Sequence, residues 1–404
     1  MNLVRPDLGF AAIWLLVLAA YVPFPTLLTP PLGVGVTAMV VFNIAAAPVI
    51  YYAVRWRLML RFPGRKEVRL PSLRRDYIPI LTDFIYLLMA IWSAIFLSGV
   101  IYSGGVPLIW YLRGDGRQYL DFGIRSISGF GDMLQYFAAT LCVLLYCLTR
   151  RKFFGLLWLV HLVPTILHVS RGAFFLFLLQ SFCMVFLVQK LRYRHLLLIA
   201  LVLAISAGVW VGLGQLRGIR MSASDYSEVD QYFGDLPVGL YWAWVYFVTP
   251  LGNVAYGVSL HNDPHYFPYF TLAATLPTFL RVALFPAAGY NPVPLIVESD
   301  NAVSMYAPLV ADFGLAGAVL CMTVFQVVAT YAYVRARYGD LFYLLLYPSL
   351  YTALILSFFH IFILTPQFLA VPFVCMWLRR FMERRKSRQA PILAAAGQIA
   401  MPIP

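Results

Sequence analysis

The sequence is poor in charged residues. Only 12% of its 404 residues are Asp, Glu, Lys or Arg, against about 25% in a soluble domain. Hydrophobic residues make up 62%, and the mean hydropathy is +0.79. This leaves too little polar side chain to cover several soluble domains, and it excludes a disordered chain or a disulfide-stapled secreted fold. The composition therefore predicts an all-α polytopic membrane protein.

Motifs for several kinds of chemistry are lacking as well. The sequence has no Walker A motif, no DxD, no GxSxG and no HExxH. His261, Asp263 and His265 form a His-x-Asp-x-His pattern, which is a weak metal signal in a loop. No cysteine lies in a C-x-x-C pair, and all fall in apolar runs, where cysteine acts as a small buried hydrophobe. We therefore expect no metal or nucleotide cofactor. The cysteines are Cys142, Cys147, Cys183, Cys321 and Cys375.

Ten apolar runs approach the length of about 20 residues that a membrane-spanning helix needs. Several are short or interrupted by proline. Arg5 is the one basic residue before the first run, and the cleavage signal after the run is weak. Both features favour a signal anchor over a signal peptide. The runs cover residues 9–28, 32–54, 79–103, 128–149, 154–169, 172–189, 195–214, 307–334, 341–362 and 366–378.

The net charge of +13 suggests a nucleic-acid partner until the basic residues are placed along the chain. If every run crosses the membrane once, 23 of the 30 Lys and Arg residues lie on one side. The positive-inside rule assigns that side, with both termini, to the cytoplasm. The excess charge therefore describes topology, and we expect no nucleic-acid partner. The seven remaining residues on the outer side are Arg113, Arg117, Arg125, Arg171, Arg217, Arg220 and Arg281.

The outward segment 215–306 is too long for a simple connection. It contains two aromatic, apolar stretches, 236–260 and 266–287. They are either re-entrant or interfacial helices, or two further spans that raise the total from ten to twelve. The joint between them has no Lys or Arg, which favours the first interpretation. The predicted organisation is seven spans in 1–214 with a basic cytoplasmic loop at 55–78, the loop 215–306, three spans in 307–380 and a cytoplasmic tail, 381–404.

Arginines on the outer side are candidates for binding an anion, because positive charge is disfavoured there. Arg171 lies between two long apolar runs with almost no loop, where a charge is costly unless it is paired or solvated. It either extends toward lipid phosphates or holds a phosphate or pyrophosphate with its planar donors. Arg217 and Arg220 share a face if the preceding helix continues, which suits a pyrophosphate clamp. Ordinary loop charges remain the alternative.

Three elements in order resemble the O-antigen polymerases, the Wzy-type polymerases of oligosaccharide repeat units. The first is a Gly- and Pro-containing outer loop, the second Ser170-Arg171-Gly172 at the head of a span, and the third an Asn-containing stretch before Asp-Phe-Gly-x-x-Gly. Ser304 stands where Thr is common in the family. The residues concerned are Gly104–Leu108 with Tyr119–Ile124, Ser170–Gly172, and Asn301, Ser304 and Tyr306 followed by Asp312–Gly317.

The resemblance implies a GT-C-like, inverting glycosyltransferase of the bacterial inner membrane with its active site facing the periplasm. Such an enzyme joins repeat units carried on undecaprenyl pyrophosphate into O-antigen or a related polysaccharide, without a nucleotide sugar, and can work with a chain-length regulator. Its partners would be the lipid-linked oligosaccharide and membrane lipids. We expect the pyrophosphate to be bound by Arg171, Arg217, Arg220 and Arg281. The candidates for a general base are Asp225, Asp230, Glu298, Asp300 and His265; Asp312 is alternatively a carboxylate stabilised by a helix dipole.

Two other functions remain open. An O-antigen ligase, which transfers the glycan to the lipid A core, shares the topology and the need for arginines. Loss of a polymerase leaves one repeat unit on the core, whereas loss of a ligase leaves none. A lipid-linked oligosaccharide flippase or other transporter should instead carry charges deep within several spans and show internal repeats.

Overall fold

The fold is all-helical in the part of the chain that the structure describes, and no strand occurs there. It was obtained as a computed structural model of the whole chain. Its helices range from the seven-residue α4, Pro107–Arg113, to α15, Pro366–Ile399. The described residues are 4–63, 77–189, 208, 212, 238–260, 263–286, 292–297 and 302–399.

Nine of the ten predicted apolar runs coincide with helices among the described residues, and the run 195–214 lies outside them apart from two isolated positions. By length and composition, five helices of this part could cross a membrane: α2, α3 continued by α4, α5, α13 and Leu341–Phe358. The class of helical membrane protein is thus supported. The nine helices are α1 Pro6–Tyr21, α2 Val34–Arg61, α3 Tyr77–Ser103, α5 Ile127–Thr149, α6 Lys152–Leu167, α7 Arg171–Val188, α13 Tyr306–Arg337, α14 Leu341–Ile355 and α15.

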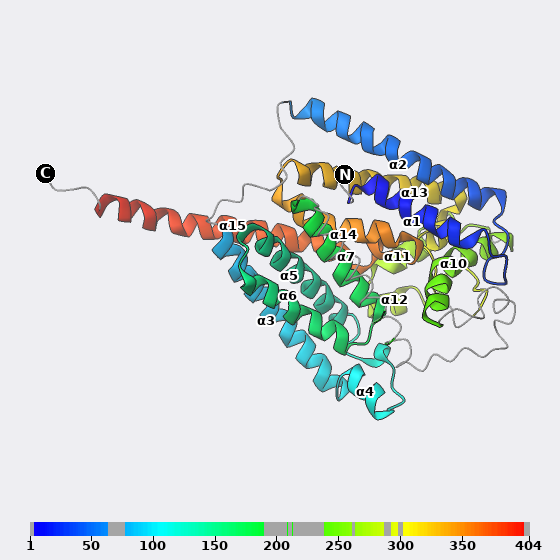
Figure 1. The fold of residues 1–404 in the computed structure, drawn as a ribbon, viewed down its shortest axis with the longest axis horizontal. Helices are drawn as coiled ribbons and strands as arrows, with labels where there is room; N and C mark the ends of the chain where they lie inside the picture. Colours follow the sequence, from blue (N-terminus) through cyan, green and yellow to red (C-terminus); the bar gives the residue numbers. More distant parts are fainter. Residues whose placement is uncertain are drawn as a thin grey trace.

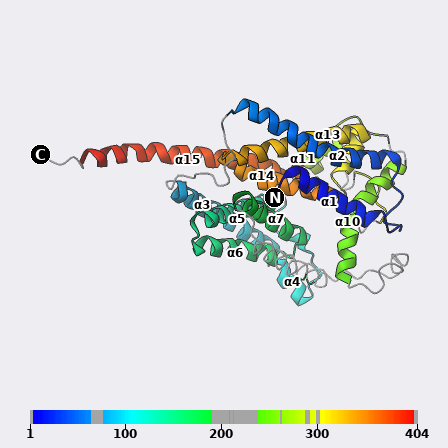
Figure 2. The same ribbon diagram turned by 45° about the horizontal axis from the view of Figure 1, so that its top comes forward.

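These helices run between two ends of an elongated bundle (Figure 1, Figure 2). One end, which we call the basic end, gathers the C-termini of α2, α5, α7 and α13 with the N-termini of α3, α6 and α14. There the Arg335 guanidinium lies 5.0 Å from the centre of the Phe62 ring, which follows α2. Arg337 donates a hydrogen bond to the Leu187 carbonyl of α7 at 3.4 Å. Helix α15 extends past this end (Figure 1).

The opposite end, which we call the loop end, carries the connecting segments. Trp244 of α10, Val238–Ser259, donates to the Ala20 carbonyl at the C-terminus of α1 at 2.8 Å. The Met305 amide, just before α13, donates to the Ser357 carbonyl after α14 at 2.7 Å. Among the described helices, those at the basic end thus begin or end where the basic clusters of the sequence lie.

Close contacts between helices occur at small residues, as in other membrane bundles. A Cβ atom added at Gly9 of α1 would lie 2.7 Å from the Tyr351 hydroxyl of α14. Some polar side chains inside the bundle donate hydrogen bonds to backbone carbonyls, which offsets the cost of burying a polar group there. The Gln326 amide of α13 donates to the Asn43 carbonyl of α2 at 3.2 Å.

The two apolar stretches of the long loop behave differently from each other. The first forms the 22-residue helix α10, which buries Val248, Leu251 and Val254 in the core. The second forms α11, Tyr269–Thr275, and α12, Thr278–Leu284, which are separated at Pro277. Each has seven residues and spans about 10 Å, a third of a hydrocarbon core. This favours re-entrant or interfacial helices over a further span in the second stretch.

Candidate functional site

Asp312 joins α13 to α11 at the loop end. Its carboxylate is fully buried and accepts hydrogen bonds from the Phe270 amide at 2.9 Å and from the Thr271 amide at 2.7 Å. The Thr271 hydroxyl donates a third bond at 2.7 Å. Both amides belong to the first turn of α11, where N–H groups have no partner within the helix. Because both carboxylate oxygens are engaged, the geometry favours capping over catalysis.

A kink at Gly314 explains why glycine follows in the Asp-Phe-Gly motif. Gly314 interrupts α13 with φ 69° and ψ −177°, a combination that residues with a Cβ adopt only with strain. A Cβ atom there would meet the Pro264 ring at 3.5 Å, and the neighbouring His265 amide donates to the Ala311 carbonyl at 2.9 Å. The Asp-Phe-Gly motif therefore fastens the segment before α11 onto α13.

Ser304 and Tyr306, two other residues of the third resembling element, are also buried. The Ser304 hydroxyl accepts the Tyr306 amide at 3.2 Å, and the Tyr306 ring packs 5.1 Å from that of Trp14. Asn253 of α10 donates to the Ala302 carbonyl at 2.9 Å, which ties this stretch to α10. These residues connect α1, α10 and α13, and so position the loop end.

Arg281 is one of the four arginines expected to bind pyrophosphate, and it is partly buried on α12. The Thr278 amide at the start of α12 donates to the Ser126 hydroxyl at the head of α5, at 3.0 Å. His360 lies between α14 and α15, and burial, followed by the charge of Arg281, lowers its pKa. A guanidinium and a neutral imidazole near each other can both hydrogen-bond an anion.

Arg171 occupies the first position of α7, as the sequence indicated. The Ser170 hydroxyl caps the helix by accepting the Ala173 amide at 3.3 Å, and Val169 before it has φ 54°. The N-terminus of α7 thus carries Arg171 at the loop end, where unpaired amides and the helix dipole favour an anion. The position of the Arg171 side chain lies outside the structure's description.

The Gly-rich loop before α5 is held by Arg117 rather than left open for an anion. Arg117 Nε lies 2.9 Å from the Asp115 carboxylate, and its Nη1 donates to the Ser103 carbonyl at 2.6 Å. Its guanidinium also stacks 4.3 Å from the centre of the Trp110 ring. The hydrogen bond from Arg117 lowers the pKa of Asp115. Arg117 therefore has a structural role.

Of the candidates for the general base that the sequence predicted, His265 alone lies in the described part of the chain. His265 is exposed, and its ring centre lies 5.6 Å from that of Phe270, close to the Asp312 joint. Of the described Asp, Glu, His and Cys residues, no group of three could hold a metal ion. The residues that lie outside the described part are Asp225, Asp230, Glu298, Asp300, Arg217, Arg220 and Asn301.

Asp132 is a carboxylate that the sequence reasoning passed over. It lies in the second turn of α5, a helix whose residues are mostly buried inside the bundle. On the same face, the Tyr136 ring packs against Phe177 of α7 at 6.3 Å, and Gly129 lies against Gln367 of α15. Asp132 therefore shares the face of α5 that meets α7 and α15. The available signal was an acidic residue inside an apolar run, which is costly and often functional.

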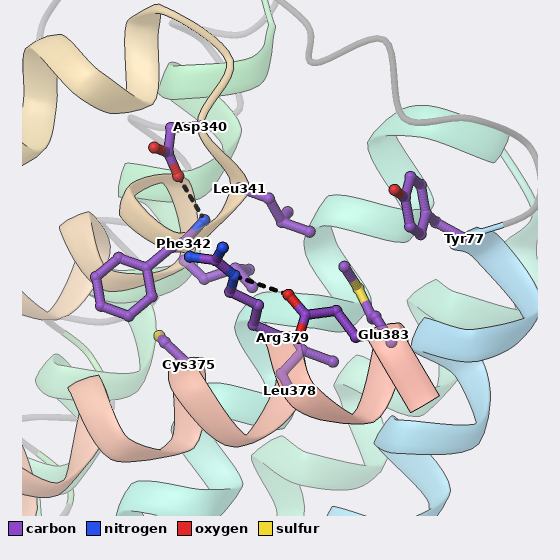
Figure 3. A pocket seen from close by; sticks show the side chains of 10 residues that line it. Tyr77, Asp340, Leu341, Phe342, Cys375, Leu378, Arg379 and Glu383 are labelled. Carbon is purple, nitrogen blue, oxygen red and sulfur yellow. Dashed lines mark hydrogen bonds and ion pairs between the residues drawn. The ribbon is translucent and has the colours of Figure 1, made fainter. Parts of the chain in front are cut away.

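A cavity of about 360 Å³ lies at the basic end, and none of the expected site residues that the structure describes lines it (Figure 3). The N-termini of α3 and α14 and the middle of α15 form its walls. Figure 3 shows Arg379 extending under Asp340 toward the cavity, with Glu383 beside it. This cavity does not belong to the candidate site at the loop end.

Comparisons with protein-family models, with curated proteins and with solved structures give no match to the chain.

Proposed function

We propose that the protein is a membrane glycosyltransferase that polymerises oligosaccharide repeat units carried on a lipid pyrophosphate, at the periplasmic face of a bacterial inner membrane. The observation that carries the proposal is the arrangement of the loop end. There α11 is fastened to α13 by Asp312, α12 is tied to the head of α5, and Arg281 lies near His360. The N-terminus of α7, with Arg171, belongs to the same end.

The chemistry of the proposed reaction matches these groups. A sugar hydroxyl attacks the anomeric carbon of the growing chain, and the bond to the pyrophosphate oxygen breaks with its electron pair. Arginines stabilise the charge that develops on the leaving pyrophosphate, so no divalent metal is required. Arg281 and Arg171 are the two described positions for this role, and Arg217 and Arg220 complete the proposed set.

The proton of the attacking hydroxyl requires a general base. To Asp225, Asp230, Glu298, Asp300 and His265 we add Asp132. Its position inside α5, near the end where Arg281 and Arg171 lie, suits a carboxylate that meets a sugar at the membrane surface. Because Asp312 uses both oxygens to cap α11, it is the weaker candidate.

The placement of charge favours an enzyme over a transporter. Among the described residues, the acidic side chains inside the spans are Asp83, Asp132 and Asp312, each within about two turns of a helix end. A transporter would be expected to carry such groups at mid-membrane. A ligase uses the same leaving group, so only the product separates it from a polymerase.

The proposal is tested with purified protein and a lipid-linked repeat unit, without nucleotide or divalent metal. A polymerase yields a ladder of products that differ by one repeat unit. Transfer of a preformed glycan to lipid A core without chain growth would assign the ligase reaction instead. Movement of the substrate across proteoliposomes without any new glycosidic bond would support the transporter.

A further inference from the structure

The cavity at the basic end is lined by both charged and apolar side chains (Figure 3). Its apolar floor contains Leu345, Cys375 and Leu378, each of which is at most 2% exposed. Its polar lining contains Asp340, Arg379 and Glu383, with Tyr77 at one wall. The volume of about 360 Å³ lies in the range of sites that bind small molecules.

The cavity lies at the level where lipid headgroups meet the protein, whichever way the bundle is inserted. Tyr77 is the first residue of α3, and Leu341 is the first residue of α14. Arg379 follows directly on the apolar run of α15 that ends at residue 378. All three walls therefore belong to the ends of apolar helices, where the hydrocarbon core gives way to headgroups.

The charged residues that line the cavity are of both signs. Asp340 accepts the Phe342 amide at 3.1 Å and pairs with Arg335 at 2.6 Å. Arg379 pairs with Glu383 through Nε at 3.1 Å. A headgroup that is only anionic would meet two carboxylates here, and a choline group has no N–H with which to bind them. A group with one phosphate and one primary ammonium satisfies both signs.

The flank of α15 beside the cavity is suited to lipid chains. Phe373 is 67% exposed, and Trp377 is 38% exposed while its ring packs 5.0 Å from that of Phe84. Tryptophan is enriched at the boundary between hydrocarbon and headgroups, whereas an exposed phenylalanine suits contact with the chains. A lipid whose headgroup enters the cavity could therefore lay its chains along α15.

From this chemistry we propose that the cavity binds the headgroup of a phosphoethanolamine-type phospholipid. Arg379 binds the phosphate, and Glu383 accepts a hydrogen bond from the ammonium group, with Asp340 as a second carboxylate of the lining. This site is independent of the proposed glycosyl transfer, because it lies at the opposite end of the bundle (Figure 1). No covalent step is involved.

The proposal is tested by native mass spectrometry of the purified full-length chain in detergent, titrated with phosphatidylethanolamine, phosphatidylglycerol or phosphatidylcholine. We expect preferential retention of phosphatidylethanolamine. Arg379→Gln and Glu383→Gln should each weaken that retention about fivefold or more, as loss of roughly 1 kcal/mol would. The matched control is Arg380→Gln, since Arg380 is the exposed neighbour of Arg379 and does not line the cavity; it should leave retention unchanged.

The effect of Glu383→Gln decides the class of ligand. A phosphoethanolamine site loses affinity when this carboxylate is removed, whereas a site for anionic lipids gains affinity. Unchanged or stronger binding of phosphatidylethanolamine by Glu383→Gln, or equal retention of all three lipids by the unchanged protein, would overturn the proposal. So would binding of soluble glycerophosphoethanolamine as tight as that of the lipid. Lipid preference of the unchanged protein decides the matter even if a variant fails to fold.

Discussion

Asp312 and Thr271 form a two-point contact between α13 and α11: one carboxylate oxygen accepts both the amide and the hydroxyl of Thr271, each at 2.7 Å. This contact fixes the first turn of a seven-residue helix that could not persist alone in water. The position of α11 therefore depends on Asp312, and α12 with Arg281 follows α11 after only two residues.

Removal of this carboxylate should destabilise the protein. We expect Asp312→Ala to lower the free energy of unfolding by about 3 kcal/mol or more, because it leaves buried amides without an acceptor. Thr271→Val removes only the hydroxyl bond and should cost about 1 kcal/mol. Thermal unfolding of both variants in detergent measures the difference. Equal stability of Asp312→Ala and the unchanged protein would refute the capping role.

The kink at Gly314 should tolerate no side chain. Gly314→Ala places a Cβ at φ 69°, and we expect a loss of about 1–3 kcal/mol in stability. Gly155→Ala is the matched control, since Gly155 is helical in α6 and its added Cβ meets only ordinary contacts at 3.8 Å. That change should be neutral or slightly stabilising. Similar unfolding temperatures for the two variants would contradict this account of the kink.

His360 should make stability depend on pH. Burial and the charge of Arg281 lower its pKa in the folded protein, so the unfolded chain binds the proton more readily. Its contribution is complete above the unfolded pKa of about 6.5 and is lost as the pH falls below that value toward the folded pKa. His360→Gln should flatten this part of the stability profile, measured by unfolding between pH 7 and pH 5. Arg281→Gln should make it less steep, and an unchanged profile in both variants would show that His360 does not titrate on unfolding.

Much of the architecture could be predicted from the sequence, because apolar runs and basic clusters act locally. Helices form at nine of the runs. The helix ends that carry basic residues, such as Arg335 at the end of α13, lie together at one end of the bundle. The role of Asp312 could not be predicted, since it caps a helix 41 residues earlier in the chain rather than its own. The break at Pro277 was likewise hidden in a continuous apolar stretch. Asp132 was visible as an acid in a span, but its neighbours on α7 and α15 were not.

Asp132 should affect the rate of reaction more than folding, if it accepts the proton of the sugar. We expect Asp132→Asn to lower kcat by about 100-fold or more with little change in KM, and Asp132→Glu to recover part of the loss. Asp83→Asn is the matched control, since Asp83 is an exposed acid in the second turn of α3 at the basic end. Full activity of a folded Asp132→Asn variant would exclude Asp132 as the general base. The proposed reaction would still stand with another base.

The proposed reaction is tested most directly by the size distribution of products that the purified protein makes from a lipid-linked repeat unit in the absence of nucleotide and divalent metal. The account predicts a ladder with steps of one repeat unit, which Arg281→Gln reduces at least tenfold and which Arg113→Gln, at an exposed arginine of the same end, leaves intact. Unreacted substrate from a folded, unchanged protein, or a ladder that Arg281→Gln does not diminish, would contradict it.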